Sequence, residues 1–134
     1  MGFERGDIVE ILNKEEGLKG SYYPANIISR VSNKDYIVQY RTLLEEDGSG
    51  PLREFMSTDR IRPTPREIVA DAFRLSEVVD AYDRDGWWVG KVIGKTGSKY
   101  VVHFKGTGEK IAYPLDRLRV HQEWDWKNGV WYFG

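Results

Sequence analysis

Aromatic side chains stand in adjacent pairs at two matching places in the chain, Tyr22-Tyr23 and Trp87-Trp88. Because successive side chains of a β-strand point to opposite faces, one ring of each pair is expected to face outward while the other enters a core. Rings that surround a cavity bind alkylammonium groups through their π systems, at roughly 0.5–2 kcal/mol per ring. A methylated lysine suits such a cage because methylation keeps its charge.

Further residues could complete an aromatic cage in each half of the chain. The first-choice cage joins three tyrosines with one carboxylate: Tyr22, Tyr23, Tyr40 and Asp47. The second-choice cage is wholly aromatic: Tyr82, Trp87, Trp88 and Phe104. Glu45 and Glu46, in the loop that follows Tyr40, are candidate contacts for a cationic peptide through charge-assisted hydrogen bonds. The same acidic, glycine-rich loop is also compatible with an ordinary solvated turn.

Catalysis and metal binding have little support in the sequence. The chain contains no cysteine, which excludes disulfides, thiolate zinc sites and cysteine nucleophiles. Its two histidines, His103 and His121, are not accompanied by a nucleophile elbow, a phosphate-binding loop or metal-ligand spacing. We therefore expect a protein that is not an enzyme and that uses neither a cofactor nor a metal.

The charge balance argues against a nucleic-acid partner. Twenty Lys and Arg residues face 21 Asp and Glu residues among 134, a net charge of −1. No apolar run approaches the roughly 18 residues of a membrane helix, and the N-terminus lacks a secretory pattern, so we expect no membrane association and a nuclear or cytosolic location. Four arginines are interleaved with Asp or apolar residues and are expected to pair with local carboxylates: Arg60, Arg62, Arg117 and Arg119.

An internal repeat positions these residues. Gly6–Glu10 is echoed by Ser76–Asp80, 70 residues later, and Asp59–Arg62 by Asp116–Arg119, 57 residues later. The first copy therefore carries longer loops, around residues 15–17 and between Leu43 and Leu52. Loops that lengthen in this way often hold function.

Each copy has the pattern of short strands separated by turns. In the first copy these strands cover residues 8–12, 23–31 and 36–41, with a weaker one near Phe55. Strands of this length in copies of about 60 residues predict an all-β fold of two small, strongly bent antiparallel sheets or barrels, packed together as a tandem unit. No long amphipathic helix is expected.

We divide the chain into a first unit (1–63), a packed linker (64–73) and a second unit (74–134). Pro63-Thr64-Pro65 ends the first copy because proline lacks the donor of a β-ladder. Apolar residues such as Ile68 and Phe73 indicate that the linker packs against the units. Since a unit this small is marginally stable alone, the two are expected to share an interface and to form one cooperative body.

The aromatic C-terminal segment, residues 121–132, is predicted to dock back on the sheets as a hairpin. Asn128-Gly129 is the strongest signal for a type I′ turn. Trp124 and Trp126 are therefore interpreted as structural residues.

The first copy resembles the first unit of a plant tandem Agenet module, a Tudor-like domain of the Royal superfamily. The resemblance lies in residues 16–25, Tyr36–Tyr40 and Ile61-Arg62-Pro63. The second copy resembles the second Agenet unit through Val78–Ala81, Gly86–Val92 and the ending Leu118–Trp124, and is also similar to the second Tudor-like unit of the fragile X protein family. The likeness covers nearly the whole chain.

This resemblance implies a monomeric module of a longer, nuclear, multi-Agenet heterochromatin protein involved in gene silencing. Its implied partner is the tail of histone three, dimethylated on the lysine at the ninth residue and unmethylated on the lysine at the fourth. The Tudor-type cage maps onto Tyr23 with Tyr40 in the first unit, and onto Trp88 with Phe104 in the second. The resemblance favours the first unit as the methyl-lysine reader. In such cages an aromatic residue often ends the first strand, but the first unit has Leu12 at that position.

Two alternatives remain open from the residues alone. Trp87, Trp88 and Tyr22 could act as stacking platforms for single-stranded RNA. A sheet edge or the groove between the copies could instead bind a protein segment independently of methylation.

Overall fold

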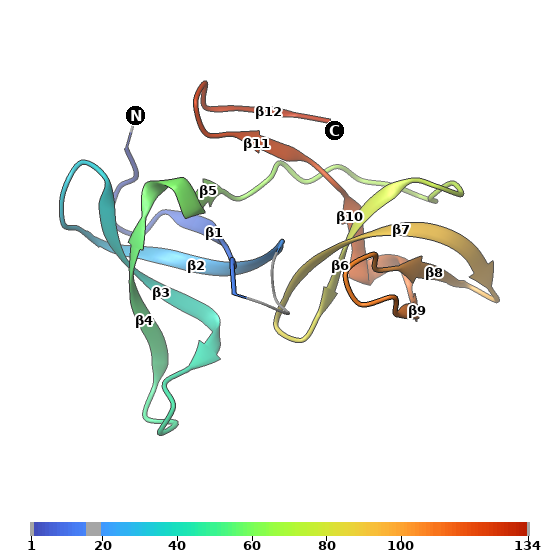
Figure 1. Ribbon diagram of the computed structural model, residues 1–134, viewed down its shortest axis with the longest axis horizontal. Coiled ribbons are helices and arrows are strands. Elements are labelled where there is room, and N and C mark those ends of the chain that lie inside the picture. Colours follow the sequence, from blue (N-terminus) through green and yellow to red (C-terminus); the bar gives the residue numbers. More distant parts are fainter. Residues whose placement is uncertain (1, 16–19, 134) are drawn as a thin grey trace.

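The computed structural model describes residues 2–15 and 20–133, and it confirms an all-β chain (Figure 1). The first unit contains β1 (Ile8–Leu12), β2 (Ser21–Arg30), β3 (Asp35–Leu44), β4 (Pro51–Ser57) and β5 (Ile61–Pro63). The second contains β6 (Val78–Asp83), β7 (Gly86–Thr96), β8 (Lys99–His103), β9 (Lys110–Tyr113) and β10 (Leu118–Val120). The strands β11 (Glu123–Asp125) and β12 (Val130–Tyr132) follow. Residues 16–19, which carry part of the Agenet-like motif and of the longer first loop, lie outside the described residues.

Helical structure in the described ranges amounts to two short 3₁₀ turns, Thr58–Arg60 and Leu115–Arg117, each just before the last strand of its unit. No helix in this part of the chain has the length and apolar character needed to span a membrane.

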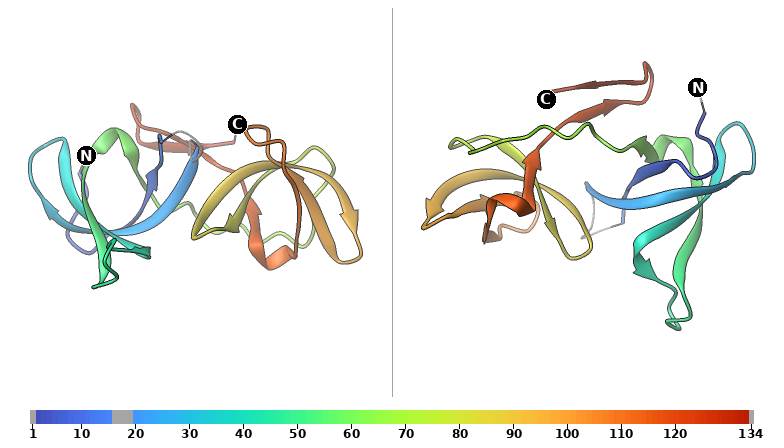
Figure 2. Two further views of the ribbon diagram at one scale, coloured as in Figure 1. Left: turned by 60° about the horizontal axis from the view of Figure 1, so that its bottom comes forward. Right: turned by 180° about the vertical axis from the view of Figure 1, so that it is seen from behind.

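Each unit is an antiparallel sheet that curves strongly without closing (Figures 1 and 2). In the first unit β1 pairs with β2 and β5, β2 with β3, and β3 with β4. The long strands β2 and β7 have register shifts at matching places, between Ile27 and Ser29 and between Val92 and Gly94. A bulge bends a strand and increases its twist, so one strand can serve both halves of each sheet.

The two cores are built from equivalent positions. Buried and less buried residues alternate over residues 35–40 of β3. The same alternation recurs in β8 and the residue that follows it. Tyr36 lies opposite Met56 in the first unit, and Tyr100 lies opposite Tyr113 in the second. The repeat therefore describes two copies of one core.

A strand pair joins the two units, and it contains the first residue of each aromatic pair. β2 pairs antiparallel with β7, with Tyr22 directly opposite Trp87. In the first pair one ring faces outward from its own core, as expected, but neither ring is open to solvent, because Tyr22 is 6% exposed and Tyr23 is 5% exposed. Tyr23 enters its own core, whereas Tyr22 faces the other unit.

Charged side chains fill the interface beside this strand pair. Glu10 lies opposite Arg62, and the equivalent Asp80 lies opposite Arg119. Arg62 donates from Nε and Nη2 to Glu10 Oε1 (3.1 and 2.8 Å), and Arg119 donates from Nε to Asp80 Oδ2 (2.8 Å). Arg119 also crosses to the other unit, donating from Nη1 to Glu10 Oε2 at 2.8 Å.

These contacts confirm the expected pairing of Arg62 and Arg119 with local carboxylates, and both residues lie within the last strand of their unit. Arg60 differs, because its Nε donates to the Leu12 carbonyl at 2.9 Å. Arg117 lies 6.0 Å from the ring of Tyr82.

The linker packs mainly at its end. Phe73 is buried in the second core, whereas Val69 is 85% exposed. The side chain of Gln122 donates to the carbonyl of Arg66 at 2.9 Å, so the residues after β10 tie back to the linker.

The C-terminal hairpin is confirmed, and it lies beside the start of β5 (Figure 2), where Trp126 Nε1 donates to the Ile61 carbonyl at 2.9 Å. The predicted type I′ turn is wrong. Asp125 lies opposite Val130, so four residues connect the strands, and Gly129 but not Asn128 has a positive φ. The reason is that the Asp125 carboxylate accepts the backbone N–H groups of residues 127 and 128, which fixes a longer turn.

Candidate functional site

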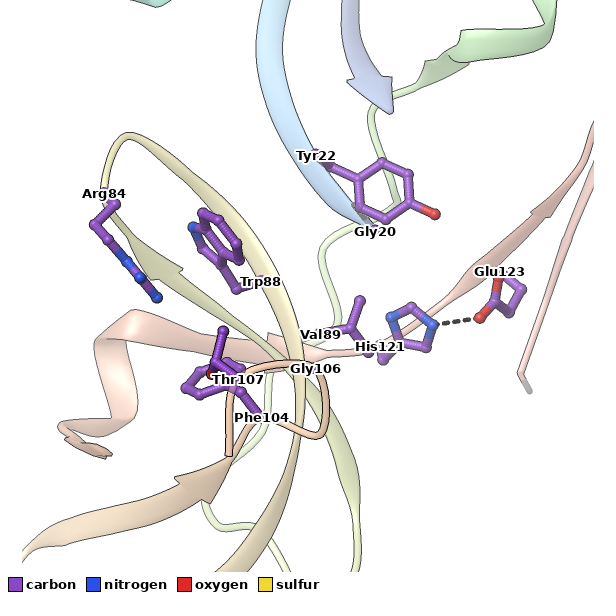
Figure 3. Close-up of a pocket in the computed structure, with 10 residues that line it drawn as sticks. All are labelled: Gly20, Tyr22, Arg84, Trp88, Val89, Phe104, Gly106, Thr107, His121 and Glu123. Atoms are coloured by element: carbon purple, nitrogen blue, oxygen red, sulfur yellow. Dashed lines mark hydrogen bonds and ion pairs between the residues drawn. The ribbon is translucent and has the colours of Figure 1, made fainter. Parts of the chain in front are cut away.

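A cavity of about 480 Å³ lies at the junction of the two units, which we name the junction pocket (Figure 3). Three of its walls are candidate cage rings: Tyr22 from β2, Trp88 from β7 and Phe104 just after β8. The full lining is Gly20, Tyr22, Arg84, Trp88, Val89, Phe104, Gly106, Thr107, His121 and Glu123. The structure thus brings one first-choice residue together with two second-choice residues.

Asp83 fixes the aromatic walls from the second unit. The indole Nε1 of Trp88 donates to the Asp83 carbonyl at 2.7 Å, and the Tyr113 hydroxyl donates to Asp83 Oδ2 at 2.6 Å. Phe104 packs edge-on against Tyr113, with ring centroids 6.2 Å apart. Burial and the Asp83 carboxylate raise the pKa of Tyr113, so its hydroxyl remains a donor. No spacing rule singled out Asp83 or Tyr113; the repeat alone marks Tyr113, as the counterpart of Met56.

A cation already lies against the pocket's indole. The Arg84 guanidinium carbon is 4.4 Å from the centroid of Trp88. Arg84 also forms an ion pair with Glu109 (3.5 Å), in which both side chains are about half exposed. The pocket therefore has an aromatic surface that a positively charged group contacts.

The opposite wall carries a histidine between two carboxylates, of which Figure 3 draws that of Glu123. His121 Nδ1 is 2.6 Å from Asp80 Oδ1, and Nε2 is 2.6 Å from Glu123 Oε1. Burial would lower the pKa of His121, but hydrogen bonds and charge from Asp80 and Glu123 outweigh it and raise the pKa. Burial would likewise raise the pKa of Asp80, but His121 and Arg119 hold it below its usual value.

Tyr23 and Tyr40 lie in the core of the first unit, apart from Tyr22. The ring of Tyr23 packs on the second unit, because a Cβ at Gly86 would lie 2.8 Å from Tyr23 Cε1. Tyr40 is buried, and burial together with Glu54 raises its pKa. Tyr22 instead carries the Arg62 guanidinium over its ring, 3.3 Å from the centroid.

Tyr82 and Trp87 lie outside the junction pocket. Their rings meet edge-on, 5.1 Å apart, and the Arg119 guanidinium covers Trp87 at 3.9 Å from the centroid. Trp87 lines a separate cavity with linker residues 64–70. The second-choice set is therefore divided between the two sides of the strand pair.

The acidic residues lie at the tip of the β3–β4 hairpin. Glu45, Glu46 and Asp47 surround an open hollow together with Ser49. Hydrogen bonds from Ser49 lower the pKa of Asp47, so that carboxylate stays charged. The same hairpin is tied near its tip to the turn that carries Arg84, because Thr42 Oγ1 donates to the Asp85 carbonyl at 2.7 Å. At about 3.3 Å per residue, the tip begins roughly 10 Å further along β3.

Comparison with known proteins follows the same division into two units. Residues 6–66 match the Agenet domain. The crystal structure of AGDP1 AGD34 from Arabidopsis thaliana superimposes with a TM-score of 0.91 at 33% identity, covering 98% of this chain and 90% of that one. The chain belongs to the Agenet domain family. The ADCP1 tandem Agenet domain 3-4 is similar as well, with a TM-score of 0.86 and 31% identity over 98% of this chain and 88% of that one.

Longer plant proteins contain related tandem Agenet segments. Protein AGENET DOMAIN (AGD)-CONTAINING P1 of Arabidopsis thaliana is 35% identical over 96% of this chain, and DUF724 domain-containing protein 3 of the same plant is 34% identical over 92%. This chain spans 25% and 19% of their lengths. Tandem Agenet domains are Tudor-like, chromatin-associated interaction modules.

Proposed function

We propose that this tandem Agenet module is a nuclear chromatin reader that binds a methylated lysine of the histone three tail. The proposed mark is the dimethylated lysine at the ninth residue, next to an unmethylated lysine at the fourth. The observation that carries the proposal is the junction pocket, whose aromatic wall already contacts a cation at 4.4 Å.

A methylammonium group would enter between Trp88 and Phe104, and Tyr22, whose ring stacks on Arg62, would bound the pocket on the side of the first unit. All three rings are more than nine-tenths buried, so the cation would contact rings with little competing water. Methyl groups add apolar surface that these rings can cover, which an unmodified ammonium lacks. The rings thus favour the methylated form of lysine.

The acidic hairpin supplies the second contact. An unmethylated ammonium near Glu45, Glu46 and Asp47 would form charge-assisted hydrogen bonds that methylation removes. Five residues of an extended tail span about 17 Å, so the two lysines would be bound at separate points of the module. We expect micromolar affinity, about −8 kcal/mol, because exposed ion pairs and a few rings must also offset the ordering of the tail.

The RNA alternative is weakened by two arginines that cover its candidate stacking rings. Tyr22 and Trp87, two of its three stacking platforms, each have a guanidinium over the ring, at 3.3 and 3.9 Å from the centroid. Methylation-independent docking has one feature in its favour, since among the described strands β4 pairs with β3 alone and leaves an open sheet edge. Equal affinity for methylated and unmodified tails would favour that alternative.

The test is calorimetric titration with histone-three tail peptides, unmodified and dimethylated at the ninth residue, at two salt concentrations. We expect tighter binding of the methylated peptide, lost in Trp88→Ala and unchanged in Tyr132→Ala, whose ring is 51% exposed on β12. Tyr40→Ala, with folding checked by thermal melting, tests the equivalent ring of the first unit. Loss of binding in Tyr40→Ala alone would move the cage to Tyr23 and Tyr40.

A further inference from the structure

Arg84 is held in the junction pocket by an unusual turn. β6 and β7 are joined by two residues, since Asp83 lies opposite Gly86. Both turn residues have positive φ, 49° at Arg84 and 66° at Asp85. This is the type I′ geometry that normally selects Asn-Gly, Asp-Gly or Gly-Gly. A long side chain thus occupies a position where a left-handed backbone disfavours it.

The turn directs that side chain over Trp88. The guanidinium carbon stands 4.4 Å from the indole centroid, and the residue lines the same pocket as Phe104 and Tyr22 (Figure 3). Backbone strain that persists in a structure is often found at binding sites. Here the strained turn places the Arg84 guanidinium against the aromatic ring that a cationic ligand would contact.

Arg84 differs from the other two arginines that stack on rings at the junction. Arg62 is fully buried and Arg119 is 19% exposed, and each donates hydrogen bonds to buried carboxylates. The side chain of Arg84 is 46% exposed, and its ion-pair partner Glu109 is 41% exposed at 3.5 Å. Exposed pairs of this kind are weak. Arg84 can therefore leave its ring, whereas Arg62 and Arg119 are locked.

We propose that Arg84 is an internal competitor that occupies the cation site of the junction pocket until a methylated ammonium displaces it. The identity of the natural ligand rests on the proposed function, but the competition is a property of the pocket itself. While Arg84 occupies the site, the pocket cannot bind another cation, so only a fraction of the molecules has an open pocket. The apparent affinity of every competing cation is lowered by the same factor. Ligands with low intrinsic affinity then fail to bind at working concentrations.

The test uses small cations, which need no histone sequence. Tetramethylammonium and Nε-dimethyl-lysine are titrated while the Trp88 indole N–H signal is followed by NMR. Arg84→Gly removes the side chain and suits the left-handed backbone, and Arg84→Gln keeps a shorter, polar side chain without the charge. Both variants are expected to bind the two cations about three- to sixfold more tightly, the factor expected from an exposed cation–π contact. Arg5→Ala is the control. It removes an exposed arginine that is distant from Arg84 in sequence, and it should leave both affinities unchanged.

The outcomes separate this proposal from the proposed function. Unchanged or weaker binding of the cations in both Arg84 variants overturns the competition, and so does the absence of any shift of the Trp88 signal in all proteins. If the cations bind more tightly to the variants while histone-three peptides bind to none of the proteins, the competition stands and the proposed histone ligand is wrong.

Discussion

Arg62 and Arg119 illustrate, at the scale of single residues, how a guanidinium is stabilised away from water. Each donates to a carboxylate that is at most 2% exposed and lays its flat face on an aromatic ring. The N–H groups at the edge of each guanidinium donate to the carboxylates, while its flat face packs on the aromatic ring. Among the described residues, no buried side-chain nitrogen or oxygen lacks a partner.

Glu10 accepts hydrogen bonds from an arginine of each unit, so its neutralisation should be costly. We expect Glu10→Gln to lower the free energy of unfolding by about 3 kcal/mol, because it leaves buried positive charge poorly compensated. Chemical denaturation measures this change. Lys14→Ala serves as the control, since it removes an exposed ion pair to Asp59 and should change stability by less than about 1 kcal/mol. Equal effects of both variants would contradict the role of Glu10.

His121 should make stability depend on pH. Its pKa in the folded state is raised above the ordinary value of 6.5, so its contribution is complete below pH 6.5 and is lost as pH rises through the folded pKa. Melting temperatures of the parent protein and His121→Gln should therefore differ more at pH 6 than at pH 9. A difference that stays constant or widens at pH 9 would rule out this protonated bridge.

At the scale of elements, β7 has two roles. It pairs with β6, β8 and β2, and it also supports the junction pocket. Its Gly90 is equivalent to the buried Ala25 of the first unit. A Cβ at position 90 would collide with Val102 and lie 3.0 Å from Phe104 Cε1. The second unit thus uses a glycine where Val102 and Phe104 approach the strand too closely for a Cβ.

Two glycines of β7 provide a matched test of this packing. Gly90→Ala should destabilise by about 1–3 kcal/mol through overpacking and should weaken cation binding by displacing Phe104. Gly94→Ala should leave both properties nearly unchanged, because nothing lies within 4 Å of the position that the added methyl group would take. Thermal melts and the tetramethylammonium titration measure the two effects. Similar behaviour of the two variants would contradict a special role for Gly90.

The strands were predictable because their signals are local. Alternating apolar residues and turn residues mark residues 8–12 and 36–41, and the structure has strands over Ile8–Leu12 and Asp35–Leu44. The repeat likewise pointed to Trp88 and Phe104. The pairing of β2 with β7, the burial of Tyr22 beneath Arg62 and the turn set by Asp125 depend on partners distant in sequence or on competing side chains, so no local pattern reveals them.

At the scale of the whole molecule, the shared sheet and buried charges should make the two units unfold together. Hydrogen exchange of Ile11 in β1 and Val79 in β6 should report one common free energy of opening, equal to that of global unfolding. Tryptophan fluorescence, which reports residues 87–131, should melt with the same midpoint as far-ultraviolet circular dichroism. Two separated transitions would show that the units are thermodynamically independent.

The strand pair at the junction places Tyr22 opposite its own counterpart, Trp87. Equivalent residues that face each other across an antiparallel pair define a local two-fold axis, the geometry of a symmetric homodimer. The chain thus has the form of a dimer whose subunits have been fused, and the linker supplies the partner at a fixed effective concentration. Fusion also frees the two halves to diverge, so that one side of the axis could acquire Trp88 and Arg84 while the other acquired the acidic hairpin.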